Sequence, residues 1–181
     1  MVLIFKDYPH FKPDLTPLEM FKSGIVGGSY FRNIHSHKTN KTYSTKDIEK
    51  FKFLNKIPKK LLITQYYDKS LNKFKVKAGS TYKEWLDKDW IDENDAPRGW
   101  IHWYCHFYSG RRTSDDERQI KRWINFASTN SGRFKIRFQN IINQKGYNDI
   151  NVSPVIQQNL LEWAVDSTKM KPKNDYILNI N

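Results

Sequence analysis

Hydrophobic residues recur with helical spacing through the second half of the chain. The first such segment opens after Pro97 and ends at Gly110, and its aromatic residues follow the i, i+3, i+4, i+7, i+8 pattern of a helix: Trp100, Trp103, Tyr104, Phe107 and Tyr108. Aromatic side chains on such a face could stack on unpaired bases, as they do in single-strand binders. Five aromatic residues on one helical face more often form core, and we expect core here.

The next segment predicts a second helix. Ser114 and Glu117 have the spacing of a capping box, and acidic residues favour a helix N-terminus. One face of this helix is apolar and consists of Ile120, Trp123, Ile124 and Ala127. A polar turn from Ser128 to Gly132 separates it from the helix that follows.

Two further helices complete this half of the chain. The third is predicted to end at Gly146 and carries Phe134, Phe138, Ile141 and Ile142. The fourth begins at Ser153 and Pro154, since proline is favoured in the first helical turn, and directs inward Ile156, Leu160, Trp163 and Ala164. Four successive helices with short links indicate a mainly α domain.

The first ninety residues are rich in lysine and show little periodicity. Thr16, Pro17 and Glu19 still predict a short helix, as N-cap, first helical residue and capping-box acid, and Gly24 ends it. Ser80 is the expected cap of a second short helix. Elsewhere in this half we expect loops and turns.

Together these elements predict a mainly α fold: a single compact helical domain over residues 1–181 with an irregular, Lys-rich N-terminal half. The length of 181 residues fits one domain. We expect residues 7–166 to be compact, with the densest core in the four helices between Pro97 and Asp166. The tail over 167–181 is expected to be loose, although Tyr176, Ile177 and Leu178 could dock back onto the domain.

Composition excludes several classes of protein. Aromatic residues make up 15% of the chain, which excludes a wholly disordered basic protein. One cysteine permits no internal disulfide. No apolar run in the sequence reaches the length of a membrane span, and the N-terminus lacks a signal-peptide core. We therefore expect an intracellular protein with no membrane partner.

The formal charge of +12 comes from lysines and arginines, and these two residue types carry different information about function. There are 23 Lys, 15 Asn and 17 Ile but only 4 Ala, a skew that an AT-rich genome produces whatever the protein does. The lysines are therefore equally consistent with a solvated surface. Arginine is the better indicator, because the same skew works against it and seven of the eight arginines lie between Arg98 and Arg137.

The clustered arginines predict a nucleic-acid-binding face. On the second helix the basic residues lie opposite the apolar ones, and further arginines flank it. Because guanidinium groups bind phosphate oxygens in bidentate fashion, we expect phosphate contacts, with DNA the favoured partner, through Arg111, Arg112, Arg118, Lys121, Arg122, Arg133 and Arg137. The alternative is an ordinary amphipathic helix whose outer charges pair with Asp115, Asp116 and Glu117.

An enzyme acting on nucleic acid or nucleotides is the second hypothesis. It would use the polar cluster Arg111–Gln119, in which arginines adjoin carboxylates. The backbone N–H groups of Gly27-Gly28-Ser29 could cradle an anion, although the turn lacks the lysine and the spacing of a phosphate-binding loop. His102 and His106 have a metal-capable spacing, but no HExxH pattern accompanies them. Neither a metal site nor a cofactor is predicted.

Several stretches together resemble a family of small proteins from large DNA viruses and fungi. They are LTPLEMF at 15–21, GGSYFR at 27–32, GWIHWYC at 99–105, GRR and DDERQIKRW between 110 and 123, and SPVIQQ at 153–158. The resemblance spans about residues 7 to 166, implies a single domain and a large-DNA-virus source, and carries over no catalytic residue. A virion structural or genome-packaging protein is the third hypothesis, and the expected location is host cytoplasm, nucleus or virion.

Overall fold

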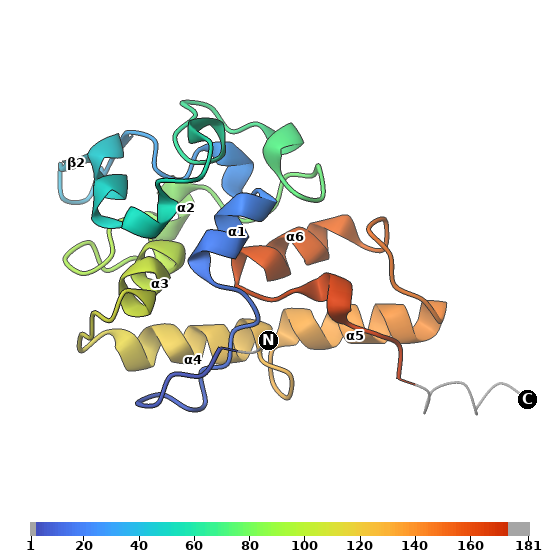
Figure 1. Cartoon of the computed structure of the whole chain (residues 1–181). Helices are drawn as coiled ribbons and strands as arrows, with labels where there is room; N and C mark the ends of the chain where they lie inside the picture. The colour runs from blue at the N-terminus through green and yellow to red at the C-terminus, as the bar shows by residue number, and fades with distance from the viewer. Residues whose placement is uncertain (1–2, 174–181) are drawn as a thin grey trace, which may run out of the picture.

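The structure is a computed structural model and describes residues 3–173. Its α-helices are α1 (Pro17–Ser23), α2 (Tyr82–Asp87), α3 (Trp100–Tyr108), α4 (Asp116–Ala127), α5 (Arg133–Lys145) and α6 (Pro154–Glu162). Helices α4 and α5 run nearly in line along one side of the molecule, and α6 packs on α5 (Figure 1). The prediction of a mainly α fold is confirmed.

Short 3-10 helices and one hairpin make up the rest of the regular structure. The 3-10 helices are η1 (Val26–Gly28), η2 (Thr45–Lys50), η3 (Lys52–Leu54), η4 (Lys59–Leu61), η5 (Lys69–Leu71) and η6 (Ser167–Lys169). Strand β1 (Ile34–His35) pairs antiparallel with β2 (Thr42–Tyr43), and Ile34 lies opposite Tyr43. None of the helices within residues 3–173 combines the length and the apolar character needed to cross a membrane.

The hydrophobic core is shared by both halves of the chain, with its larger share in the segment of the four later helices between Pro97 and Asp166. Phe11, Phe31 and Phe51 come from the irregular half and are almost fully buried. Phe11 packs on Trp103 of α3 with 5.7 Å between the ring centroids. These aromatic anchors have no periodic spacing, so the sequence pattern did not reveal them.

Helix α3 is covered on nearly every side because the N-terminal half wraps around it. Its aromatic face is buried as predicted, except for Tyr108 at the end of the helix. The opposite face, which carries His102 and His106, is also covered, and both imidazole rings contact the ring of Phe51. A helix that is apolar or buried all round belongs to the interior of a domain rather than to its surface.

Local capping signals in the sequence correctly predicted one end of each of the helices α1, α5 and α6. In α1, the Thr16 hydroxyl accepts a hydrogen bond from the Glu19 N–H at 3.1 Å, and the Glu19 carboxylate accepts one from the Thr16 N–H at 2.8 Å. Helix α5 ends at Gly146, whose φ of +74° is the left-handed conformation that glycine favours. Helix α6 begins with Pro154 in its first turn.

Two predicted caps were wrong. The cap of α2 is Thr81, one residue after Ser80. Ser114 and Glu117 form no capping box, because α4 begins only at Asp116. The buried Asp116 carboxylate accepts hydrogen bonds from the Thr113 N–H at 3.0 Å and from the Trp103 indole N–H at 2.8 Å. This tertiary contact fixes the start of the helix in place of the local signal.

The real cap at Thr16 and the absent cap at Ser114 predict different losses of stability. Thr16→Ala removes a side-chain acceptor from the first turn of α1 and should lower the free energy of unfolding by about 1 kcal/mol. Ser114→Ala should change it by less than about 0.5 kcal/mol, because the exposed Ser114 caps nothing in α4. Urea unfolding followed by tryptophan fluorescence measures both values. Equal losses for the two variants would mean that Ser114 does cap a helix in solution.

The start of the C-terminal tail is attached to the domain rather than loose. The Asn148 side-chain amide donates to the backbone carbonyls of Ser167 at 2.9 Å and Met170 at 2.8 Å. The Asn143 side-chain oxygen accepts from the Lys173 N–H at 2.9 Å. The predicted docking of residues 176–178 lies outside the residues that the structure describes.

Candidate functional site

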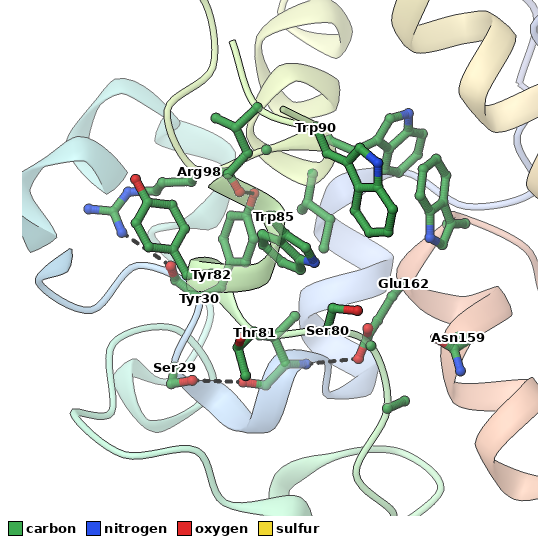
Figure 2. A pocket seen from close by; sticks show the side chains of 18 of the residues that line it. Ser29, Tyr30, Ser80, Thr81, Tyr82, Trp85, Trp90, Arg98, Asn159 and Glu162 are labelled. Atoms are coloured by element: carbon green, nitrogen blue, oxygen red, sulfur yellow. Dashed lines mark hydrogen bonds between the residues drawn. The ribbon is translucent and has the colours of Figure 1, made fainter. Parts of the chain in front are cut away.

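A pocket of about 850 Å³ lies where the N-terminal half meets the C-terminal helices. One wall comes from the loop after α1, from residues 77–81 and from α2, and the other comes from α4, α5 and the end of α6. Figure 2 shows Tyr82 and Trp85 approaching from α2, and Asn159 and Glu162 from α6. The volume is in the range of pockets that hold drug-sized ligands or cofactors.

A column of stacked aromatic rings forms one side of the pocket. The rings of Phe134 and Phe126 are 4.1 Å apart between centroids and nearly parallel. Trp163 follows at 4.6 Å from Phe126, and Trp100 lies 4.8 Å from Trp163. Phe126, Phe134 and Trp163 are only half-buried, so part of the column faces the open space. Planar exposed rings of this kind stack well on other flat π-systems.

Two arginines lie against this column. The Arg122 guanidinium is 5.6 Å from the centroid of the Trp163 ring, and the Arg133 guanidinium is 5.7 Å from the centroids of both Phe126 and Phe134. Arg122 donates hydrogen bonds to the Trp90 carbonyl and to the Gln119 side-chain oxygen, both at 2.9 Å. These bonds hold its guanidinium group at the edge of the pocket.

The lining carries an excess of positive charge. Its basic residues are Arg32, Lys77, Arg98, Arg122 and Arg133, and its acidic residue is Glu162. Arg98 is neutralised by Asp47, at 3.1 Å between nitrogen and oxygen. Within residues 3–173, no carboxylate oxygen lies within 4 Å of a charged nitrogen of the other four basic residues. Burial lowers the pKa of Arg122 to about 10, so it remains a cation at neutral pH.

Glu162 is a buried carboxylic acid at the end of α6. Its Oε1 accepts hydrogen bonds from the Val26 N–H at 3.3 Å and from the Gln158 side-chain amide at 3.2 Å. Its Oε2 faces Gly79, where an added Cβ would lie 3.3 Å away. Burial raises the pKa of this carboxyl from its ordinary value of 4.5 to about 7. Both its protonated and its ionised forms are therefore accessible near neutral pH.

The structure separates the residues that the sequence grouped into one phosphate-binding face. Three of them form ion pairs: Arg111 with Asp95, Arg112 with Asp7, and Arg118 with Asp115. Lys121 and Arg137 are exposed on α4 and α5 and line no part of this pocket. Arg122 and Arg133 are the two predicted residues that meet in the pocket.

The polar cluster Arg111–Gln119 has structural contacts throughout. Asp116 is buried under α3, and Asp115 accepts hydrogen bonds from the side chains of Arg118 and Gln119 at 2.8 Å each. The Arg111 guanidinium donates to the backbone carbonyl of Asp95 at 3.0 Å. Because none of these residues lines the pocket, the cluster is a scaffold that orders the start of α4.

The Gly27-Gly28-Ser29 turn does not cradle an anion. Its N–H groups donate to the Asn72 side chain, the Ile25 carbonyl and the Val26 carbonyl respectively, at 2.7, 3.1 and 3.0 Å. Glycine is required at Gly28 for packing, since its φ is +71° and an added Cβ would lie 2.2 Å from the Lys60 carbonyl oxygen. The turn therefore joins two loops and shapes one wall of the pocket.

The histidines do not assemble a metal site. Within residues 3–173 no group of three or more His, Cys, Asp or Glu side chains is close enough to hold a metal ion. His102 is buried, and burial lowers its pKa well below the ordinary value. Its neighbour His106 has a pKa lowered to about 4, again mainly by burial. Both imidazoles are therefore neutral packing groups at physiological pH.

Glu162 and Arg32 line the pocket, although the sequence pattern predicts neither as a site residue. Arg32 belongs to the GGSYFR stretch but stands outside the arginine cluster, and Glu162 lies on a side of α6 that periodicity assigns to solvent. An unpaired acid in a basic pocket can be recognised only once the loops that cover α6 are placed.

Comparison of the chain with protein-family models, curated proteins and solved structures finds no match.

Proposed function

We propose that this protein binds nucleic acid by taking an unpaired nucleotide into the pocket between α2, α4, α5 and α6, with DNA the favoured partner. The observation that carries the proposal is the meeting of the aromatic column with Arg122 and Arg133 at one opening. Aromatic side chains stack on unpaired bases, and arginines bind the flanking phosphates. A base inside a duplex is stacked on both of its faces and offers no free face to such a column.

The two other hypotheses receive less support from the geometry. A genome-packaging protein would need positive charge but no shaped pocket, and here the pocket walls come from segments far apart in the sequence. An enzyme acting on nucleotides would share the pocket and could use Glu162 as a proton acceptor. The Arg111–Gln119 cluster gives such chemistry little support, because its three arginines form ion pairs with Asp95, Asp7 and Asp115 and none of its residues lines the pocket.

The proposal predicts that Arg122→Ala with Arg133→Ala weakens binding of a single-stranded oligodeoxynucleotide. Loss of two phosphate contacts should reduce the slope of log K against log salt by about 1.4, since each contact contributes about 0.7 for a single strand. At low salt the affinity should fall about tenfold or more. Fluorescence anisotropy of a labelled oligonucleotide between about 50 and 200 mM salt measures both quantities.

The matched control is Arg118→Ala with Arg137→Ala. It removes the same charge from the same two helices but touches neither the pocket nor the aromatic column. We expect it to retain most of the affinity and of the salt slope. If the control loses as much as the pocket variant, the phosphates lie along the outer face of α4 and α5. If the pocket variant binds like the parent at every salt concentration, the proposal is wrong.

A further inference from the structure

Oε2 of Glu162 is an acceptor in the pocket that the protein leaves unused, and the buried Tyr82 hydroxyl in the same lining also has no partner among residues 3–173. Oε1 of Glu162 is held by the Val26 N–H and the Gln158 amide, but among residues 3–173 no donor lies within hydrogen-bonding distance of Oε2. Although the residue is only 9% exposed, Oε2 itself is not sealed inside the protein and faces the space of the pocket. A carboxylate oxygen that accepts no hydrogen bond from the protein is free to accept one from a ligand in the pocket.

Neighbouring charges do not compensate this carboxyl group. In the part of the chain that the structure describes, no lysine, arginine or histidine nitrogen lies within 4 Å of Glu162. Tyr67 lines the pocket on another segment, and its hydroxyl accepts hydrogen bonds from Asn72 and from the Ala78 N–H rather than donating to Glu162. A ligand N–H group is therefore the natural partner of Oε2.

Bases differ in what they can offer to such an oxygen. Adenine, cytosine and guanine carry an exocyclic amino group, whereas thymine and uracil have two carbonyl oxygens on either side of their single ring N–H. If that N–H donated to Oε2, the carbonyl oxygens would approach the carboxylate and repel it. A carboxylate therefore accepts an amino group more readily than it accepts the edge of thymine.

We propose that Glu162 makes the pocket selective for an unpaired nucleotide whose base carries an amino group, by accepting a hydrogen bond from that group at Oε2. This inference rests on the proposed function, because it requires that the ligand is a nucleotide. The base would stack on the aromatic column, its amino group would face Glu162, and its phosphate would lie at Arg122 or Arg133. Glu162 is thus a specificity-determining residue.

Titration of the intact protein with dAMP, dCMP and dTMP tests the inference. Trp85, Trp90, Trp100 and Trp163 line the pocket, so tryptophan fluorescence reports on occupancy. At pH 8, where the Glu162 carboxyl is ionised, dAMP and dCMP should bind about tenfold more tightly than dTMP. At pH 6 the preference should shrink, because a protonated carboxyl donates to carbonyl oxygens as well. Ionisation of the phosphate cancels in this ratio.

Glu162→Gln keeps the shape of the side chain but can turn an amide N–H toward the ligand. It should abolish both the preference for amino-bearing bases and its dependence on pH, while dTMP binds at least as well as it does to the parent. The control Glu117→Gln makes the same chemical change at an exposed site on α4 and should retain the preference.

Each outcome decides between the two proposals. Loss of the preference in Glu162→Gln and its retention in Glu117→Gln support the inference. Equal affinity of the parent for all three nucleotides overturns the inference but leaves the proposed function standing, provided that Arg122→Ala with Arg133→Ala still weakens binding. If neither nucleotides nor oligonucleotides bind, the proposed function fails and the inference fails with it.

Discussion

Asp47→Ala should lower the free energy of unfolding by about 3–5 kcal/mol, because it leaves a buried arginine without its counter-ion. Arg98 is 1% exposed, and its guanidinium contacts the Asp47 carboxylate through Nε at 3.2 Å and Nη2 at 3.1 Å. Urea unfolding monitored by tryptophan fluorescence should show a lower midpoint with the same slope. An unchanged midpoint would mean that water reaches Arg98 in solution.

A second variant separates the charge of Arg98 from its shape. The same guanidinium donates to the backbone carbonyls of Tyr30, Arg32 and Ser44 at 3.2, 2.7 and 2.8 Å. Arg98→Lys keeps the charge but supplies three donors from one nitrogen, so it should also destabilise the protein. The control Lys83→Ala breaks an exposed pair with Asp87 on α2 and should leave the midpoint unchanged.

Arg98 also shows why the arginine cluster could not be interpreted from sequence alone. Its presence among seven arginines between positions 98 and 137 suggested a common role. In the structure Arg98 ties loops together inside the protein, Arg111 and Arg112 pair with Asp95 and Asp7, and Arg122 and Arg133 face the pocket. Sequence proximity places these residues on adjoining elements, but the direction of each side chain depends on tertiary contacts.

Helices α1, α5 and α6 were predictable because their signals are local. Thr16 and Glu19 for α1, Gly146 for α5 and Pro154 for α6 act within one helical turn, so their neighbours in sequence determine the outcome. The N-terminal half has few such signals. Its short 3-10 helices and loops are ordered by burying isolated aromatic residues such as Phe11 and Phe51, which have no period to detect.

The pocket was not predictable either, because its lining also depends on tertiary contacts that leave no local pattern in the sequence. Along α6, Gln158 and Glu162 lie one turn apart and read as a solvated face. The structure covers this face with the loop after α1 and with residues 72–76, which bond to Gln158 through the Gly24 carbonyl at 3.3 Å and the Phe74 N–H at 3.2 Å. Gln158 is thus buried beside the pocket and Glu162 lines it, where burial raises the pKa of the Glu162 carboxyl.

The raised pKa of Glu162 should be visible in the pH dependence of the free energy of unfolding. The pKa of Glu162 is about 7 in the folded protein, and its ordinary value, expected for the unfolded chain, is 4.5. Folding therefore favours the protonated acid. The stability from Glu162 is fully present below about pH 4.5 and is lost as the pH rises through 7, by about 3 kcal/mol in all. Glu162→Gln cannot ionise and should not suffer this loss.

The measurement is the difference in free energy of unfolding between Glu162→Gln and the parent at pH 5, 6, 7 and 8. Other groups that titrate in this range contribute equally to both proteins and cancel, so the difference isolates position 162. It should be small at pH 5 and grow to about 3 kcal/mol in favour of Glu162→Gln by pH 8. The exposed control Glu117→Gln should show a flat difference. If the difference for Glu162→Gln is also flat, water or a cation from solution keeps this carboxyl group ionised, and an oxygen satisfied in that way would give the pocket little preference among bases.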